Sequence, residues 1–185
     1  MRVIGGSARG RRLQAGAGRG IRPTTDRVRE AVFDLIGPAG PGERVLDLFA
    51  GSGALGIEAL SRGSRLAVFV ERDRRALGLT RTNLTRCGFG DRARLRQVDA
   101  RRFLEQPCAE GPFDLVLADP PYRRGWARFC LERLAQPGWL QPDGCVFIEI
   151  EAELELDRAF GPLRPGRRKR YGNTAVLEFQ RLADG

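Results

Sequence analysis

From residue 43 onward, short apolar runs alternate with segments of helical periodicity, and this alternation constrains the fold more than any other feature. Strands are predicted over residues 44–49, 66–71, 93–98, 113–118 and 145–150. Helices are predicted between them, over residues 54–61, 73–86, 101–105 and 126–135. Short apolar strands separated by helices are typical of parallel sheets that are covered on both sides. The alternation therefore predicts an α/β fold built on an open, mostly parallel sheet with helices on both faces.

The C-terminal part of the chain changes pattern. Residues 162–170 and 174–180 predict two strands joined by a short turn, which favours an antiparallel pair at the edge of the sheet. These strands bring the expected sheet to seven. In this topology the strand that ends near Arg170 runs parallel to the others, so its end reaches the same edge of the sheet. A short helix is also expected around Leu156.

The first 40 residues are basic and rich in glycine. Residues 2–5 and 11–14 are expected to pair as a small hairpin, and this segment is expected to become ordered only on its substrate. The sequence Pro23-Thr24-Thr25-Asp26 is a helix-start signal, and the helix should end near Gly37. We treat residues 1–40 as a basic arm and helix, and residues 41–185 as the core of the same single domain.

The charge of the chain points to a nucleic acid. The net charge is +9, and nearly all of the positive charge is arginine, because Lys169 is the only lysine. Arginine binds phosphates and stacks on bases, so RNA or DNA is the expected partner. A high-GC genome also encodes arginine in place of lysine, but codon usage does not explain the excess of positive over negative charge. A merely solvated basic surface is the alternative.

Several classes of site are disfavoured by what the chain lacks. It contains no histidine and its four cysteines are widely spaced, so neither a zinc site nor a histidine-based triad is expected. No apolar run approaches the ~20 residues that span a bilayer, and no signal peptide is visible. We therefore expect a cytoplasmic protein that binds no metal and acts as a monomer.

A glycine-rich turn follows the first predicted strand, between Asp47 and Gly56. Gly51 and Gly53 would let a ligand approach the backbone closely, and the start of the next helix offers free amide donors. The spacing is close to the dinucleotide fingerprint Gly-x-Gly-x-x-Gly, which by itself is a weak match. Asp47 would repel a pyrophosphate at this place and would instead suit the ammonium group of an amino-acid-like ligand.

Acidic residues end four successive strands: Asp47, Glu71, Asp99 and Asp119. Ligands of open α/β sheets bind at the carboxyl ends of the strands, so we expect these side chains to meet in one cleft. Glu71 is well placed to accept hydrogen bonds from ribose hydroxyls. Asp99 could accept from an adenine amino group or could cap the helix that follows it, and both interpretations stay open.

The fourth strand is followed by Asp119-Pro120-Pro121-Tyr122. Two prolines cannot continue the strand, so the chain must turn out at its carboxyl end. The turn combines a carboxylate, carbonyls on a stiff backbone and the flat face of a tyrosine. A nucleobase could stack on Tyr122 while its exocyclic amine donates to Asp119 and to a proline carbonyl. A rigid turn without a ligand is the alternative.

In this order, the glycine-rich turn, the acids and Asp119-Pro120-Pro121-Tyr122 resemble the class I S-adenosylmethionine-dependent methyltransferases that act on exocyclic amines. Three further stretches, over residues 2–6, 22–33 and 170–174, resemble the bacterial RsmD family, which methylates N2 of guanine 966 in 16S rRNA. The resemblance covers residues 43–180 and implies a Rossmann-like fold. It also implies S-adenosyl-L-methionine as cofactor, and 16S rRNA or the assembling small ribosomal subunit as partner.

The family pattern implies roles for individual residues. The catalytic group that grips the guanine would be Asp119, Pro120, Pro121 and Tyr122. The cofactor would be bound by Asp47, Phe49, Gly51, Ser52, Gly53, Glu71, Arg72, Asp99, Ala100 and Asp119. From the charge and the predicted topology, we expect the RNA to be bound by Arg9, Arg11, Arg12, Arg22, Thr24, Arg27, Arg123, Arg124, Arg167, Arg168, Lys169 and Arg170. Arg164 and the cations of residues 167–170 are expected to stand beside the bound base, as are Arg123 and Arg124.

Two other functions stay open. A DNA adenine-N6 methyltransferase can share Asp-Pro-Pro-Tyr, but such enzymes usually need an extra domain to read duplex sequence and flip a base. About 40 residues precede the core of this chain, which favours a base that folded RNA already displays. A nucleic-acid-binding module with a vestigial cofactor pocket is the other alternative, and the intact acids at four strand ends argue against it.

Overall fold

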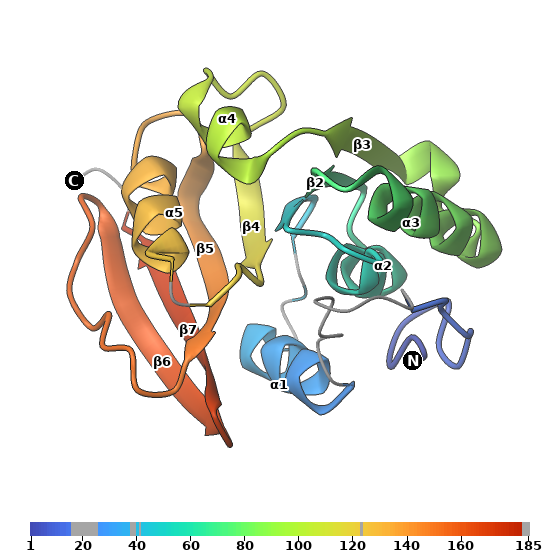
Figure 1. Ribbon diagram of the computed structural model, residues 1–185, viewed down its shortest axis with the longest axis horizontal. Helices are drawn as coiled ribbons and strands as arrows, with labels where there is room; N and C mark the ends of the chain where they lie inside the picture. The colour runs from blue at the N-terminus through green and yellow to red at the C-terminus, as the bar shows by residue number, and fades with distance from the viewer. Residues whose placement is uncertain (16–25, 38–39, 41, 123, 183–185) are drawn as a thin grey trace.

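The computed structural model describes residues 1–15, 26–37, 40, 42–122 and 124–182 (Figure 1). The helices are α1 (Asp26–Ile36), α2 (Ala54–Ser61), α3 (Arg74–Cys87), α4 (Ala100–Glu105) and α5 (Trp126–Leu134), with a 3-10 turn, η1 (Gly90–Arg92). The strands are β1 (Arg44–Leu48), β2 (Leu66–Glu71), β3 (Ala93–Gln97), β4 (Phe113–Ala118), β5 (Leu140–Glu151), β6 (Leu163–Tyr171) and β7 (Thr174–Arg181). Most bounds agree with the sequence-based prediction to within two residues.

The seven strands form one sheet in the order β3-β2-β1-β4-β5-β7-β6. β1 pairs in parallel with β2 and β4, and parallel pairing continues outward to β3 and β5. β7 pairs antiparallel with both β5 and β6. The predicted open, mostly parallel sheet with an antiparallel C-terminal pair is confirmed. Because β7 lies between β5 and β6, β6 runs in the same direction as β1–β5, and its end reaches their carboxyl edge.

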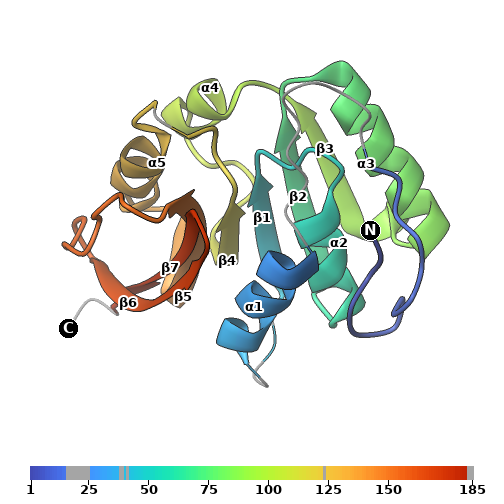
Figure 2. The same ribbon diagram turned by 60° about the horizontal axis from the view of Figure 1, so that its bottom comes forward.

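Helices cover both faces of the sheet, as predicted (Figure 2). On one face, Val32 of α1, Ile57 of α2 and Leu84 of α3 share a buried core cluster. On the other face, Leu104 of α4 and Leu131 of α5 belong to a second cluster. The central strands β1, β2 and β4 are buried on both sides, which explains why their sequences read as nearly continuous apolar runs rather than as alternating ones.

Side-chain caps fix where two helices begin. The carboxylate of Asp73 accepts hydrogen bonds from the amides of Arg75 and Ala76, both at 2.8 Å, and so satisfies two of the free donors at the start of α3. Asp99 accepts from the amide of Arg101 at 2.9 Å and begins α4 in the same way. Both caps follow directly after a strand, so they also set the carboxyl edge of the sheet.

The prediction of a helix around Leu156 is wrong. Residues 152–159 form no helix, although Leu156 itself is buried in the core. The carbonyls of Ala152 and Leu154 accept hydrogen bonds from the guanidinium of Arg168, at 2.6 and 3.1 Å. A helix would need such carbonyls for its own amides four residues later. The arginine of the neighbouring strand therefore holds this segment as irregular chain.

β5 begins at Leu140, five residues before its expected start. The sequence Gln141-Pro142-Asp143-Gly144 indicates a turn, and Asp143 does have a left-handed φ of 63°. The strand nevertheless pairs with β4 on either side of this irregularity, first between Phe113 and Leu140 and again from Leu115 and Cys145. The turn residues therefore form a bulge within a strand instead of ending it.

The N-terminal segment packs against the body of the protein. Val3, Ala8 and Leu13 are at most 6% exposed and belong to the core cluster that α2 and α3 share. The expected hairpin is present in a short form: Arg2 and Arg12 form an antiparallel bridge, the amide of Val3 donates to the carbonyl of Arg11 at 3.0 Å, and the amide of Leu13 donates to the carbonyl of Met1 at 3.1 Å. Apolar burial of three side chains adds to this pairing.

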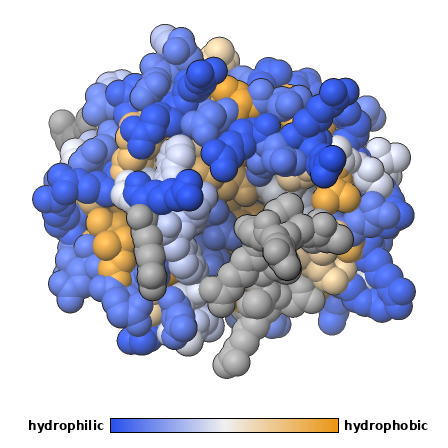
Figure 3. All heavy atoms as spheres, viewed as in Figure 1, coloured by the Kyte–Doolittle hydropathy of each residue, from blue (hydrophilic) through white to orange (hydrophobic). Residues whose placement is uncertain are grey.

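Hydrophilic residues dominate the face that Figure 3 presents, and hydrophobic residues appear there only in small separate areas. Among the described residues, Leu154 and Leu182 are the large hydrophobic side chains that are exposed, at 38% and 49%. None of the described helices is both long enough and apolar enough to span a bilayer.

Candidate active site

A cleft of about 1030 Å³ opens at the carboxyl edge of the sheet. It is lined by the four acids that the sequence analysis placed at strand ends: Asp47, Glu71, Asp99 and Asp119. Asp47 and Glu71 lie at the carboxyl ends of β1 and β2, and Asp99 and Asp119 follow β3 and β4, so the four side chains meet at one edge because these strands are parallel and adjacent. Their predicted convergence is confirmed.

Asp47 lies at the bottom of this cleft and is only 1% exposed. Its carboxylate accepts a hydrogen bond of 2.8 Å from the amide of Gly56 in the first turn of α2. The pKa of Asp47 is raised from 3.8 to about 7, mainly by burial and to a lesser extent by the negative charges of Asp119 and Glu71, against the opposite effect of the Gly56 bond. A cation bound nearby would favour the charged carboxylate.

Two buried side chains of α3 hold the glycine-rich turn. The hydroxyl of Thr80 donates to the carbonyl of Gly51 at 2.8 Å, and the amide of Asn83 donates to the carbonyl of Ser52 at 2.9 Å. Gly53 has a φ of 78°, and a Cβ there would lie 2.7 Å from the methyl group of Thr80. Glycine is therefore required by both conformation and space. Sequence reasoning missed both side chains of α3, which carry no motif.

The acids after β2 and β3 bind backbone amides as well as line the cleft. Glu71 accepts from the amides of Gly51 and Asp73, at 3.0 and 2.8 Å, and so ties the loop after β1 to the start of α3. Asp99 caps α4 and lies 3.8 Å from the guanidinium of Arg72. The two interpretations of Asp99 are therefore compatible, since one oxygen accepts from α4 while the residue lines the cleft.

Asp119-Pro120-Pro121-Tyr122 forms the part of the cleft wall that follows β4. The hydroxyl of Tyr122 donates to Glu149 of β5 at 2.8 Å and lies 2.7 Å from the hydroxyl of Thr174 on β7. Burial raises the pKa of Tyr122, so the phenol stays protonated and keeps both contacts. Its ring is thereby fixed at the cleft. Sequence reasoning did not identify Glu149, and it noted Thr174 only within a family-like stretch.

An aromatic group closes another side of the cleft. Phe49, which has an unusual φ of 62°, makes an edge-to-face contact with Trp126 at 5.1 Å between ring centroids, and both line the cleft. The guanidinium of Arg101 lies 5.2 Å from the Trp126 ring and 4.2 Å from the ring of Phe129. Sequence reasoning named Phe49 but missed Trp126, whose position at the start of α5 gives no motif.

The predicted RNA-binding cations are spread over several places. Arg124 and Arg170 line the cleft. Arg167, in contrast, forms an ion pair of 2.6 Å with Glu178 and donates to the carbonyl of Leu35 at the end of α1. β6 has an irregularity between Pro165 and Arg168, and Arg167 lies within it. Of the cations of residues 167–170 only Arg170 lines the cleft, so the expectation that all four stand beside the bound base is wrong.

The other predicted RNA-binding residues lie in the N-terminal segment, on β6 or outside the described residues. Arg9, Arg11 and Arg12 are exposed on the N-terminal segment, where Arg11 donates to the carbonyl of Arg86. Lys169 is also exposed. Arg22, Thr24 and Arg123, and the side chain of Arg27, lie outside the described part of the chain. Across the described residues, no three His, Cys, Asp or Glu side chains form a group that could hold a metal ion.

Known proteins resemble the whole chain. A family model described as Conserved hypothetical protein 95 matches residues 1–180. Ribosomal RNA small subunit methyltransferase D of Escherichia coli (strain K12) is 39% identical over 185 residues, which cover 100% of this chain and 92% of that protein. The protein of the same name from Haemophilus influenzae is 35% identical over 158 residues, which cover 84% of this chain and 81% of that one.

Solved structures agree with these matches. The structure of yhhF from Escherichia coli superposes with a TM-score of 0.87 at 38% identity and covers 100% of this chain and 99% of that one. An RNA methyltransferase from Salinibacter ruber, in complex with S-adenosyl-L-homocysteine, has a TM-score of 0.64 at 21% identity, covering 88% and 95%, and shares the fold. The chain belongs to the RsmD family of class I methyltransferases.

Proposed function

We propose that this protein transfers a methyl group from S-adenosyl-L-methionine to the exocyclic N2 amine of a guanine in the 16S rRNA of the small ribosomal subunit. The observation that carries the proposal is the meeting of Asp119-Pro120-Pro121-Tyr122 with three other strand-end acids in one cleft. The Escherichia coli relative named Ribosomal RNA small subunit methyltransferase D, which matches over its near-full length, supports rRNA as the substrate.

The residues of the cleft fit the proposed cofactor. Burial raises the pKa of the Asp47 carboxyl because it disfavours the charged form. An ammonium group beside this carboxylate would stabilise the charged form. Glu71 lies at the end of the next strand, where ribose hydroxyls would find an acceptor. Asp99 and the amide of Ala100 would bind the adenine, and the turn at Gly51 allows a close approach. When bound, the cofactor supplies an electrophilic methyl group on a sulfonium.

The residues after β4 would hold the guanine. The Asp119 carboxylate and the Pro120 carbonyl would accept the two hydrogens of the N2 amine. These bonds would draw the nitrogen toward tetrahedral geometry and localise its lone pair, which is otherwise conjugated with the ring. Tyr122 would present its ring to the base, and Pro121 would stiffen the turn. Much of the rate would come from positioning, and the released proton would pass to Asp119 or to solvent.

The RNA would be bound by the basic arm and helix of residues 1–40, by the cations next to the cleft and by those of β6. In this proposal the arm belongs to the same domain as the core over residues 41–185, and the protein acts as a monomer in the cytoplasm. Each phosphate contact would steepen the salt dependence of binding, with a log–log slope of about −0.7 per contact for single strands.

The proposal is tested by transferring labelled methyl groups to naked rRNA, to small ribosomal subunits and to DNA, followed by nucleoside analysis. We expect N2-methylguanosine from one of the RNA substrates. N6-methyladenine from DNA would instead support the adenine methyltransferase. Measurable nucleic-acid binding without transfer to any of the three substrates would support a binding module with a vestigial cofactor pocket.

A further inference from the structure

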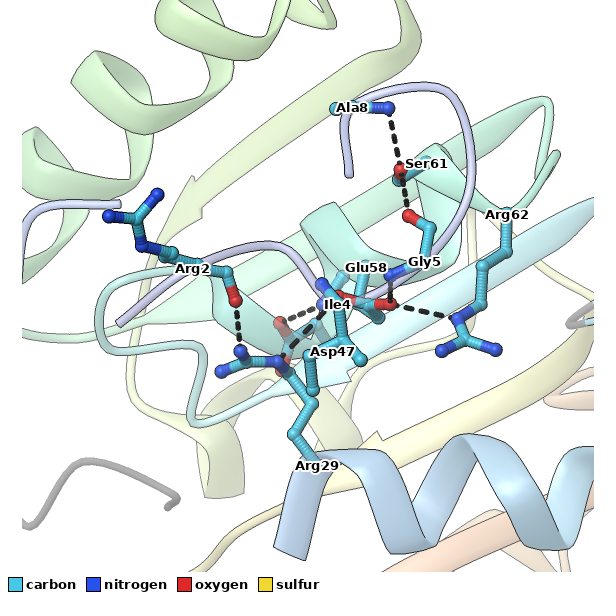
Figure 4. A network of polar contacts seen from close by, with 10 residues as sticks. Arg2, Ile4, Gly5, Ala8, Arg29, Asp47, Glu58, Ser61 and Arg62 are labelled. Carbon is cyan, nitrogen blue, oxygen red and sulfur yellow. Dashed lines mark hydrogen bonds and ion pairs between the residues drawn. The ribbon is translucent and has the colours of Figure 1, made fainter. Parts of the chain in front are cut away.

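A buried carboxylate of α2 binds the N-terminal segment (Figure 4). Glu58 is 0% exposed, and its two oxygens accept hydrogen bonds from the amides of Ile4 and Gly5, at 2.8 and 2.7 Å. A carboxylate that accepts from two consecutive amides fixes the backbone that carries them. Residues 1–13 are therefore attached to α2 by a specific polar contact in addition to their apolar burial.

The same carboxylate connects this segment to α1. Arg29, which is also 0% exposed, lies with its Nε 3.7 Å from Glu58 and donates to the carbonyl of Arg2. On the other side, the guanidinium of Arg62 donates to Glu58 at 2.8 Å. A buried charge is tolerated where such partners compensate for lost hydration. We call this group of Glu58, Arg29 and the first residues of the chain the N-terminal clamp.

A very close backbone approach completes the clamp. Gly6 has a φ of +74°, and a Cβ placed on it would lie 1.9 Å from the carbonyl oxygen of Ser61 at the end of α2. The amide of Ser7 donates to that carbonyl at 2.8 Å, and the amide of Ala8 donates to the hydroxyl of Ser61 at 2.9 Å. Any side chain at Gly6 would therefore force this backbone away from α2.

The clamp lies next to the cleft. Met1 of the clamped segment and Val28 of α1 both line the cleft, together with Leu55 in the first turn of α2. Glu58 is less than one turn beyond Gly56, whose amide binds Asp47, and Figure 4 shows Asp47 in the same close view. The helix that follows the glycine-rich turn, and whose Gly56 amide binds Asp47, thus also carries the anchor of the N-terminal segment.

We propose that the N-terminal clamp is part of the cofactor site, with Glu58 as a positioning residue that holds Met1 and Val28 in the cleft wall. This inference rests on the proposed function, because it assigns the wall to the S-adenosyl-L-methionine site. Binding in the cleft and docking of residues 1–13 are then coupled. The coupling must be reciprocal, so a ligand in the cleft must also stabilise the docked segment.

The test compares two glycines of the same segment. Gly6→Ala introduces the clash with Ser61, whereas Gly10→Ala has the same left-handed strain, with a φ of +83°, but meets nothing within 4 Å. Isothermal titration with S-adenosyl-L-homocysteine should show binding weakened about tenfold in Gly6→Ala, within the usual 5–150-fold range of coupling between sites. Gly10→Ala should bind within about twofold of the wild type, because its docking contacts remain.

A second pair of variants tests the carboxylate. Glu58→Gln replaces one acceptor by a donor that faces a backbone amide, while Glu132→Gln changes an exposed glutamate that pairs with Arg128. Only Glu58→Gln should weaken binding of S-adenosyl-L-homocysteine. Trypsin cleavage after the arginines of residues 1–12, followed by mass spectrometry, should be faster in Glu58→Gln and in Gly6→Ala. Saturating S-adenosyl-L-homocysteine should slow this cleavage in the wild type.

The outcomes are distinct. Unchanged affinity in Gly6→Ala and Glu58→Gln, although the segment is cleaved faster, would overturn the inference and leave the proposed function intact. Unchanged cleavage in both variants would overturn the clamp itself. A wild-type protein that binds no S-adenosyl-L-homocysteine would refute the proposed function, and the inference with it.

Discussion

The cleft has two halves whose polar side chains are held in different ways. In the half formed by β1, β2 and β3, the acids bind backbone amides that lie between 2 and 20 residues away in the sequence. In the half formed by β4 and the C-terminal hairpin, Tyr122 is held by Glu149 and Thr174, which lie 27 and 52 residues away. The acids of the first half are held by local turns and caps, although α3 also reaches the glycine-rich turn from 29 and 31 residues away, whereas Tyr122 in the second half is held by distant strands.

This difference suggests a division of labour. Local contacts make a preformed site that depends little on the rest of the sheet, which suits a cofactor of fixed shape. Long-range contacts link the residues beside the proposed base to the hairpin of β6 and β7, where Arg170 also lines the cleft. Substitutions in the first half should therefore affect cofactor binding, and substitutions in the second half should affect nucleic-acid binding and turnover.

The largest effect is expected for Asp119→Ala. Loss of the carboxylate removes the proposed acceptor of the N2 amine and should lower methyl transfer by about 10³-fold, the upper range for one stabilising group. The affinity for S-adenosyl-L-homocysteine, measured by calorimetry, should stay within about tenfold of the wild type. Full activity in this variant would remove Asp119 from the mechanism and end the division between the halves.

Glu71→Ala is expected to have a smaller effect, on cofactor binding and not on turnover. The change removes the acceptor for two amides and the proposed ribose contact, and charged hydrogen bonds of this kind contribute about 1.5–3 kcal/mol. Cofactor binding should weaken about 10- to 100-fold, while turnover at saturating cofactor should change little. Glu105→Ala, at an exposed position on α4, is the control. A loss confined to turnover would contradict the assignment of β2 to the cofactor half.

Asp47→Asn tests the electrostatics of the cofactor half. The pKa of Asp47 is raised from 3.8 to about 7, so between these values the folded protein keeps a proton that the unfolded chain loses. The free energy of unfolding should therefore fall with rising pH in this window, by up to about 1.4 kcal/mol per pH unit. Asparagine can still accept from Gly56 but does not titrate, so the variant should lack this decline.

Urea titrations of both proteins at pH 5 and pH 7 measure this difference. Asp91→Asn, at an exposed position of η1, controls for the loss of a carboxyl group as such. Parallel pH profiles of the wild type and Asp47→Asn would show that Asp47 titrates alike in the folded and unfolded states.

The smallest effect is expected at the contact between the hydroxyls of Tyr122 and Thr174. Thr174→Val removes one neutral hydrogen bond to Tyr122, which contributes about 0.5–1.5 kcal/mol. Turnover or the KM for RNA should change about 2- to 10-fold, with cofactor affinity unchanged. Thr174→Ser keeps the hydroxyl and should behave like the wild type. Equal losses in both variants would mean that packing, and not the hydrogen bond, holds Tyr122.

The fold and the cofactor half could be predicted because their signals are local. Apolar runs and helical periodicity located the parallel strands, and the acids after each strand mark its carboxyl end. The residues that fix these groups could not be predicted in the same way. Thr80, Asn83 and Glu149 act through contacts with segments 27 to 31 residues away, and such partners become visible only once the strands and helices are packed.

The errors have a similar origin. The helix expected around Leu156 failed because Arg168 takes the carbonyls that the helix would need. The contacts of the N-terminal segment were also not predicted, because its many glycines carry no packing signal. In the structure, Gly6 permits a close approach to α2, and Glu58, a residue without a motif, binds the neighbouring amides. Composition alone does not indicate such tertiary contacts.

The position of Arg167 has a consequence for mutagenesis of the basic hairpin. Its guanidinium links the end of α1 to β6 and forms an ion pair with Glu178. Replacing Arg167 would therefore remove the contact between α1 and β6 as well as a positive charge. A drop in RNA affinity after that change would be ambiguous. Lys169 is exposed and is the sole lysine, so Lys169→Gln could probe the electrostatic contribution at one site without disturbing any guanidinium.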